Sequence, residues 1–254
     1  MWDLLKARWK HGYQAVPNPR AARVNESFRG LPLIPAEMAP DELSRCRSVC
    51  PSGAFSGDSP AMDLGRCVFC GACVRCLNRP DFRFSNSHYL SASSRAKLIV
   101  DPTMDETNYR RRAFDPLADI FKIFKRSLKL RSVSAAGCNG CEMELNACGN
   151  PNFDMHRYGV EVVASPRHAD GLILSGPISA NMAPALLGTW EAIPSPKMLI
   201  LLGSCAISGG VFSSSPALER SFLNEHTPAL YIPGCPPHPL TVINGILDWL
   251  GAKC

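Results

Sequence analysis

The sequence predicts an α/β domain with a mostly parallel sheet, preceded by a small cysteine-rich domain. The first observation is a series of short apolar runs in the second half of the chain, each followed by a break rich in glycine, proline and serine. Buried strands that alternate with helical stretches are typical of a parallel sheet. The second observation is a turn-rich stretch from 30 to 90 that holds clustered cysteines but few long apolar runs.

Composition and charge limit the class of protein. The chain has 254 residues, of which 46% are hydrophobic and 19% charged, and this predicts a sizeable core. The net charge of +5 is milder than that of most nucleic-acid-binding proteins. Residues 1–20 lack a signal-like apolar run, and no apolar stretch reaches the roughly 18 residues that cross a bilayer. We therefore expect a peripheral protein in the cytoplasm or on the cytoplasmic face of the membrane.

The first segment, residues 1–20, predicts a short amphipathic helix that ends before Pro17. Trp2, Leu5 and Trp9 have the spacing of one helix face, and basic side chains lie among them. This helix is either a membrane-surface or partner-docking element or an ordinary surface helix, and the sequence favours neither interpretation.

The later segments follow from apolar spacing. Residues 114–130 carry a helical stripe formed by Leu117, Ile120, Phe121, Phe124 and Leu128. Strands are expected at the apolar runs 160–164, 171–174, 198–202 and 229–232. We divide the chain into an N-terminal arm (1–29), a cysteine-rich domain (30–95), a connector with a helix (96–131) and an α/β domain (132–254).

Twelve cysteines in a cytoplasmic protein require an explanation. Thiols are kept reduced in that compartment, so a disulfide framework is not expected. Clustered and regularly spaced cysteines indicate metal binding instead. A metal centre would also stabilise the small domain, which has little apolar sequence for a core of its own.

Four cysteines of the small domain have the spacing of an iron–sulfur site. Cys67, Cys70 and Cys73 form C-x2-C-x2-C, and Cys50 lies upstream, directly before Pro51. In bacterial ferredoxins three such cysteines bind one [4Fe–4S] cluster, and a remote cysteine before a proline completes a cluster. The small domain therefore resembles a ferredoxin domain with a single [4Fe–4S] cluster.

Other interpretations of this region remain open. Cys76 competes with Cys50 as the fourth ligand, although the proline after Cys50 favours the latter, and Cys46 is left over. A second ferredoxin cluster is not expected, because its other ligand positions hold leucine and proline. Four thiolates also suit tetrahedral zinc, but zinc sites usually use two C-x2-C pairs, so the tandem triplet favours iron and sulfide.

A second set of cysteines lies in the α/β region, at Cys138, Cys141, Cys205 and Cys235. The last two follow apolar runs, and ligands of parallel sheets lie beyond the carboxyl ends of the strands. Small residues flank all four cysteines, which lets backbone amides approach cluster sulfurs. Cys148 and Cys254 lack this setting, and we interpret them as bystanders.

Four stretches carry a family resemblance, namely GCNGCEMEL (137–145), PNFDMHRYGVEVVASPRHADGLILSGPIS (151–179), LGSCAISGGVF (202–212) and IPGCPPHP (232–239). The region from about 132 to 251 resembles the small electron-transfer subunit of membrane-bound, energy-converting [NiFe] hydrogenases. The same family includes the complex I subunit that holds the terminal iron–sulfur cluster. The resemblance implies a flavodoxin-like domain in which the second cysteine set binds a [4Fe–4S] cluster next to a large partner subunit.

Two details refine this resemblance. The complex I version generally has two adjacent cysteines in the first motif, whereas the C-x2-C spacing of Cys138 and Cys141 is that of hydrogenases. GYQAVP (12–17) and FRFSNSHYL (82–90) resemble the ferredoxin-like subunit of the same complexes. The chain therefore resembles a fusion of two subunits.

The resemblance implies an oxidoreductase subunit with two [4Fe–4S] clusters and no substrate-converting site of its own. It would carry electrons to or from the [NiFe] large subunit of a membrane-bound complex, formate hydrogenlyase-like or ion-pumping, with other electron-transfer and integral membrane subunits as partners. One alternative is the same role in a complex I-like or nickel-free relative that uses quinone or another acceptor. Another is a zinc-stabilised scaffold without a redox role.

Overall fold

Five parallel strands form one sheet in the order β6-β5-β7-β8-β9. The computed structural model describes residues 2–12, 14–57, 59–125 and 127–252, and the strands are β5 (Leu128–Ser134), β6 (Val160–Val162), β7 (Gly171–Ser175), β8 (Met198–Leu202) and β9 (Leu230–Ile232). In chain order this is 2-1-3-4-5, the arrangement of a flavodoxin-like doubly wound sheet. The predicted fold class is confirmed, and all five carboxyl ends lie at one edge of the sheet.

The central strands are buried on both faces. Every residue of β7 and β8 is buried, and successive side chains of a strand point to opposite faces. Leu199 and Leu201 accordingly belong to one core cluster, and Ile200 and Leu202 belong to the other. Their uninterrupted apolar sequences are those of central parallel strands, as expected.

The segment from 114 to 134 differs from its prediction. The expected helix is reduced to a 3₁₀ helix, η2 (Asp119–Lys125), and Leu128 begins the strand β5. Leu128, Leu130 and Val133 are buried, and the residues between them are exposed or half-buried. Backbone pairing with β6 and β7 on both sides outweighs the helical spacing of the apolar stripe. The predicted boundary at 132 was therefore wrong, because the sheet begins at 128.

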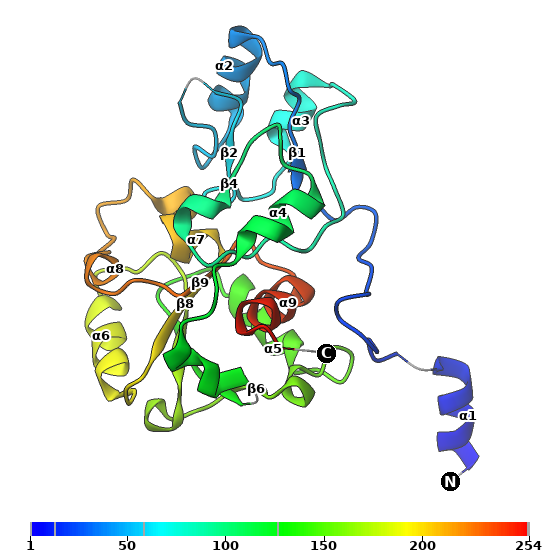
Figure 1. The fold of residues 1–254 in the computed structure, drawn as a ribbon, viewed down its shortest axis with the longest axis vertical. Coiled ribbons are helices and arrows are strands. Elements are labelled where there is room, and N and C mark those ends of the chain that lie inside the picture. The colour runs from blue at the N-terminus through cyan, green and yellow to red at the C-terminus, as the bar shows by residue number, and fades with distance from the viewer. Residues whose placement is uncertain (1, 13, 58, 126, 253–254) are drawn as a thin grey trace.

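Helices cover both faces of the sheet (Figure 1). α5 (Gly140–Cys148) and α9 (Pro239–Leu250) pack together on one face, and α6 (Ala183–Ala192) lies on the other. Nearly every residue of α9 is buried, because the N-terminal arm runs along its outer side. Asn244 Nδ2 of this helix donates a hydrogen bond of 2.9 Å to the carbonyl of Pro19.

The small domain lies beside the carboxyl edge of the sheet (Figure 1). Its elements are α2 (Pro40–Val49), α3 (Ala72–Leu77), the antiparallel pair β1 (Pro32–Leu33) and β3 (Arg83–Phe84), and the antiparallel pair β2 (Met62–Asp63) and β4 (Ile99–Val100). The remaining elements are η1 (Arg95–Leu98), α4 (Glu106–Ala113), η3 (Met155–Tyr158), η4 (Pro166–His168), α7 (Gly203–Ser208), η5 (Gly210–Phe212) and α8 (Phe222–Glu225).

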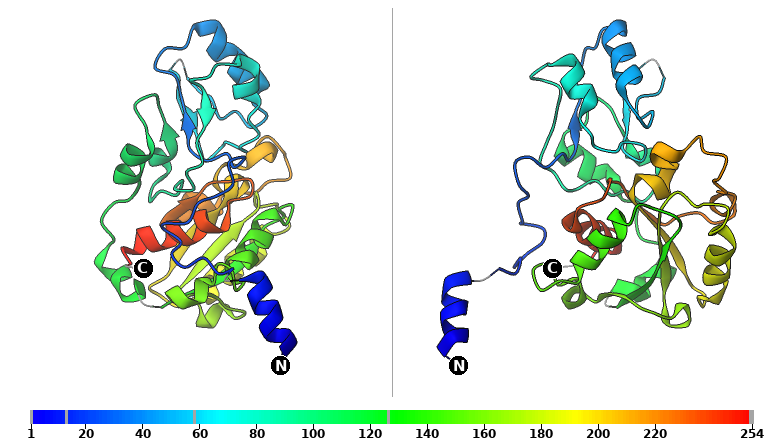
Figure 2. Two further views of the ribbon diagram at one scale, coloured as in Figure 1. Left: turned by 90° about the vertical axis from the view of Figure 1, so that its right-hand side faces the viewer. Right: turned by 180° about the vertical axis from the view of Figure 1, so that it is seen from behind.

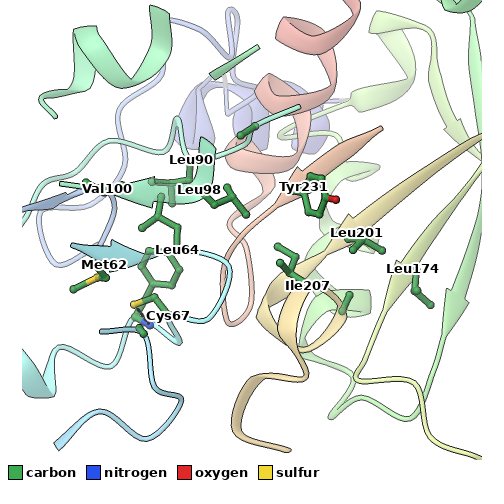
Figure 3. Close-up of a cluster of buried hydrophobic side chains, with 14 of the residues drawn as sticks. Met62, Leu64, Cys67, Leu90, Leu98, Val100, Leu174, Leu201, Ile207 and Tyr231 are labelled. Carbon is green, nitrogen blue, oxygen red and sulfur yellow. Dashed lines mark hydrogen bonds between the residues drawn. The ribbon is translucent and has the colours of Figure 1, made fainter. Parts of the chain in front are cut away.

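The two domains share one hydrophobic core. Figure 3 shows Leu64 and Leu98 of the small domain on one side, and Ile207 and Tyr231 of the α/β domain on the other. Ala92 and Tyr231 also exchange two backbone hydrogen bonds, of 3.0 and 2.9 Å. The position of the small domain on the sheet edge is therefore set by apolar packing and by backbone pairing.

The N-terminal helix α1 (Trp2–His11) extends away from the rest of the chain (Figure 2). None of its residues is buried, and Trp2 and Trp9 are 76% and 93% exposed. Within the described part of the chain, no helix is both long and apolar enough to pass through a membrane.

Candidate metal centres

The first predicted cysteine set lines a single cavity in the small domain. Cys50 ends α2, Cys67 and Cys70 lie on the loop after β2, and Cys73 lies in the first turn of α3. All four side chains line this cavity. Cys67 and Cys73 are buried, whereas Cys50 and Cys70 are half-buried.

Backbone amides donate hydrogen bonds to two of the sulfurs that line this cavity. The N–H of Ala54 donates to Cys50 Sγ at 3.2 Å, and the N–H of Phe69 donates to Cys67 Sγ at 3.3 Å. Phe69 has a positive φ of 53°, which turns the loop so that its N–H reaches the sulfur. Arg29 donates to the carbonyl of Phe69. The amide donors of Ala54 and Phe69 stabilise the negative charge that thiolates and sulfides carry.

The two leftover cysteines of the small domain do not line this cavity. Cys46 on α2 is fully buried, Cys76 on α3 is half-buried, and neither lines the cavity of the first set. Burial and, second, the neighbouring Cys76 thiol raise the pKa of Cys46 to about 11. These two thiols are therefore neighbours of each other on packed helices, and Cys46 also lies near Cys73 of the first set.

Cys148 and Cys254 were predicted to lie outside both cysteine sets, and the structure describes only the first of them. Cys148 is buried on α5, and its Sγ donates to the carbonyl of Glu144 at 3.2 Å. Cys254 lies outside the described residues.

The second predicted cysteine set lies at the carboxyl edge of the parallel sheet. Cys138 and Cys141 follow β5, Cys205 lies in α7 directly after β8, and Cys235 follows β9. Cys138 and Cys235 are exposed, and the other two are half-buried. The topology thus brings together cysteines that lie up to 97 positions apart in the sequence.

Two glycines leave no room for a side chain beside these sulfurs. A Cβ atom on Gly203 would lie 2.5 Å from Cys141 Sγ, and one on Gly210 would lie 2.9 Å from Cys205 Sγ. Both glycines also have positive φ angles, of 86° and 57°, which side-chain-bearing residues rarely adopt. The backbone therefore approaches the sulfurs more closely than any other residue type allows.

The thiols of each set influence one another electrostatically. Burial, then the Cys235 and Cys138 thiols, raise the pKa of Cys205 to about 11. Burial and then Glu142 raise the pKa of Cys141 well above its ordinary value, and the other three thiols of the set add to this effect. Four neighbouring thiols of this kind lose their protons only when bound cations compensate the charge.

The donor sets fit the predicted clusters. Each set offers four thiols from at least two chain segments, and sulfur donors select zinc or iron–sulfur clusters. Within the described parts of the chain, no three His, Cys, Asp or Glu side chains have the close spacing of a site for one metal ion. A cluster is wider than one ion, and its iron and sulfide atoms would occupy the space between the four thiols.

A buried serine joins the two sets, and this contact was not predicted. Ser204 Oγ lies 2.6 Å from the carbonyl oxygen of Cys67 and 3.1 Å from that of Gly234, the residue before Cys235. The hydroxyl donates to these carbonyls, and the Ser204 N–H donates to Gly234 at 2.9 Å. A cavity lined by both Cys70 and Cys235 lies beside this contact. The two sets are therefore neighbours across the domain junction.

We predict that Ser204→Ala lowers the free energy of unfolding by about 1–3 kcal/mol, because it leaves the buried carbonyl of Cys67 without its donor, whereas the carbonyl of Gly234 keeps the backbone N–H of residue 204. Ser213→Ala is the control, since Ser213 is exposed on the segment that follows α7, and its effect should stay within about 0.5 kcal/mol. Urea unfolding under anaerobic conditions measures both values. Equal stabilities of the two variants would contradict the junction role of Ser204.

Comparison with known proteins identifies relatives of the second half of the chain. The profile of the family described as "NADH ubiquinone oxidoreductase, 20 Kd subunit" matches residues 138–249, which include the whole second cysteine set. Formate hydrogenlyase subunit 7 of Escherichia coli is 40% identical over 134 residues, or 53% of this chain and 52% of that protein. This chain therefore spans about half the length of that relative.

Two further relatives differ in the complexes that their names describe. A probable membrane-bound hydrogenase subunit of Pyrococcus furiosus is 34% identical over 145 residues, which cover 57% of this chain and 86% of that protein. NAD(P)H-quinone oxidoreductase subunit K 2 of Synechocystis is 40% identical over 132 residues, which cover 52% of this chain and 59% of that protein.

Proposed function

This chain belongs to the family of the 20 kDa subunit of NADH ubiquinone oxidoreductase, and from that premise we propose that it carries electrons through two [4Fe–4S] clusters. The observation that carries this proposal is the convergence of two four-cysteine sets at the junction of the domains. Its larger complex would be a membrane-bound hydrogenase of the formate hydrogenlyase-like or ion-pumping kind.

The thiolates of each set would hold one cluster. Cys50, Cys67, Cys70 and Cys73 would bind the first, and Cys138, Cys141, Cys205 and Cys235 would bind the second. Bound clusters of this type accept and donate single electrons. The chain itself orients the thiolates, donates amide hydrogen bonds to sulfurs of the first set, and holds the two sets next to each other through Ser204.

The surface around the second set supports a large partner subunit. Cys138 and Cys235 are exposed, so a cluster bound there would lie at the protein surface. Met143 on α5, which carries Cys141, is 64% exposed, and Val211 and Phe212 on η5, which follows the helix of Cys205, are 49% and 46% exposed. Exposed apolar side chains around a functional site favour a protein partner. We propose that the [NiFe] large subunit covers this surface, and that other electron-transfer and integral membrane subunits complete the complex.

A quinone-reducing complex is the second candidate. The Synechocystis relative, named as a subunit of an NAD(P)H-quinone oxidoreductase, supports it. The C-x2-C spacing of Cys138 and Cys141 favours the hydrogenase. Nickel analysis and hydrogen-dependent dye reduction on the intact complex, purified through this chain, separate the two. Nickel with hydrogen uptake is the expected result, whereas a nickel-free complex that reduces quinone would overturn the hydrogenase assignment.

We also propose that α1 contacts the cytoplasmic face of the membrane. Trp2, Leu5 and Trp9 lie on one exposed face, and Lys6 lies beside it. Tryptophan and basic residues together favour the interface of an anionic bilayer. The opposite side of the helix, by contrast, borders an open groove formed with the loop after α5.

Substitution of Trp2 and Trp9 by serine should reduce binding to vesicles that contain phosphatidylglycerol by roughly tenfold or more. The reason is that two large apolar side chains, which would be transferred from water into the bilayer interface, are lost. Leu187→Ser is the control, since Leu187 is 42% exposed on α6 of the α/β domain. Co-sedimentation with the vesicles measures the binding. Unchanged binding of the double variant would exclude α1 as the contact.

A further inference from the structure

Arg220 places a guanidinium group beside the second cysteine set. Its Nη1 donates to the carbonyls of Pro177 and Cys205, at 2.8 and 3.1 Å, and its Nη2 donates to the carbonyl of Ala206 at 2.7 Å. These acceptors belong to the loop after β7 and to α7, which follows β8. The side chain thus joins two neighbouring loops at the edge of the sheet where the cysteines converge.

The backbone around Arg220 is held in place by an antiparallel contact. Residues 217–220 run beside the loop that follows β7, where Ser179 and Leu218 form an isolated bridge. The N–H of Glu219 donates to the carbonyl of Ile178 at 3.0 Å, and the N–H of Ala180 donates to the carbonyl of Ala217 at 2.8 Å. The backbone that carries the guanidinium is therefore fixed to the carboxyl edge of the sheet. Residues 211–217, which precede it, are mostly exposed.

The charge of Arg220 lies beside a predicted cluster ligand, because its guanidinium donates to the carbonyl of Cys205 itself. The Arg220 side chain is half-buried. Arginine has so high a pKa that it stays protonated in proteins. A fixed positive charge thus lies at one side of the second set.

We propose that Arg220 is a positioning residue that raises the reduction potential of the second cluster. Reduction adds one electron to a group that already carries negative charge. A nearby cation stabilises the reduced form more than the oxidised form, and partial burial limits screening by water and salt. The inference rests on the proposed function, because it requires a cluster bound by the second cysteine set. It assigns to this residue a role that cysteine spacing does not reveal.

Two substitutions separate charge from hydrogen bonding. Arg220→Gln removes the charge but keeps a donor amide, and Arg220→Lys keeps the charge but loses the planar fork. The control is Lys197→Met, because Lys197 Nζ also donates to a carbonyl, that of Trp190 at 2.6 Å. Lys197 directly precedes β8, so it lies at the opposite edge of the sheet from Cys205. Its loss removes one positive charge from the same domain.

The measurement is a redox titration of the intact complex, followed by electron paramagnetic resonance of the reduced clusters. Cys205→Ser identifies the signal of the second cluster by its absence. We expect a lower potential of this cluster in Arg220→Gln, a potential close to wild type in Arg220→Lys, and no change in Lys197→Met.

Three outcomes would overturn the inference. The first is an unchanged potential in Arg220→Gln with the cluster present. The second is a shift in Arg220→Lys as large as that in Arg220→Gln, which would indicate a purely structural role. The third is a wild-type complex without a second cluster signal, which would overturn the proposed function as well and so is distinguished from the first two.

Discussion

Replacement of Gly203 by alanine is expected to abolish the second cluster and to leave the first intact. The new Cβ would lie 2.5 Å from Cys141 Sγ and 3.4 Å from the carbonyl of Gly234, in a fully buried position. The positive φ of 86° adds a backbone cost of about 1–3 kcal/mol for a residue with a side chain. Because neither the thiol nor the strand end can move away without breaking the site, iron should fall from about eight to about four per chain.

Gly188→Ala is the matched control for this experiment. Gly188 lies in the middle of α6, and a Cβ atom there would meet nothing within 4 Å. Alanine is also a better helix former than glycine by about 1 kcal/mol. The control should therefore retain all of its iron and unfold at a slightly higher urea concentration. Full iron content in Gly203→Ala would show that the close approach to Cys141 is not required.

Cys50→Ser is expected to remove the first cluster, whereas Cys76→Ser is expected to retain it. Cys50 lines the cavity together with Cys67, Cys70 and Cys73, and its sulfur accepts the N–H of Ala54. Cys76 does not line that cavity. Serine has nearly the same shape as cysteine but is a poor ligand for iron in such clusters. Iron should therefore fall by about four per chain in the first variant and stay unchanged in the second.

Electron paramagnetic resonance of the reduced protein gives an independent readout for the same pair of variants. The signal of the first cluster should be missing only in Cys50→Ser. Cys46→Ser serves as a control for burial, because Cys46 is fully buried on the same helix but lies outside the cavity. It should lower stability without loss of iron. The reverse result, with iron lost in Cys76→Ser and kept in Cys50→Ser, would assign the fourth ligand to Cys76.

Much of the fold was predictable because central parallel strands are apolar throughout. The runs that become β7 and β8 are buried on both faces, so they are apolar throughout and can be identified as strands from their composition. β5 was missed because only Leu128, Leu130 and Val133 of its seven residues are buried, which is neither a continuous nor a strictly alternating pattern, and because its first residue continues a helical stripe. That stripe is apolar for another reason, since Phe121 packs against Trp249 of α9, with their rings 5.8 Å apart.

The cysteine sets were predictable from spacing and resemblance, but the groups around them were not. Ser204 bonds the carbonyl of Cys67, 137 positions away, and no local pattern marks such a contact. Arg220 follows a polar stretch and resembles any surface arginine in the sequence. The role that we propose for it depends on an antiparallel contact that exists only after folding. The adjacency of Ser204 to Cys205 was the one signal that the sequence offered.

The central claim is that this chain holds two iron–sulfur clusters in neighbouring thiol sets. Iron and acid-labile sulfide, counted per chain on anaerobically purified protein, test it most directly. We predict about eight of each, in a brown protein that absorbs visible light. A colourless protein with zinc in place of iron, or a count of about four iron ions per chain, would contradict the two-cluster account.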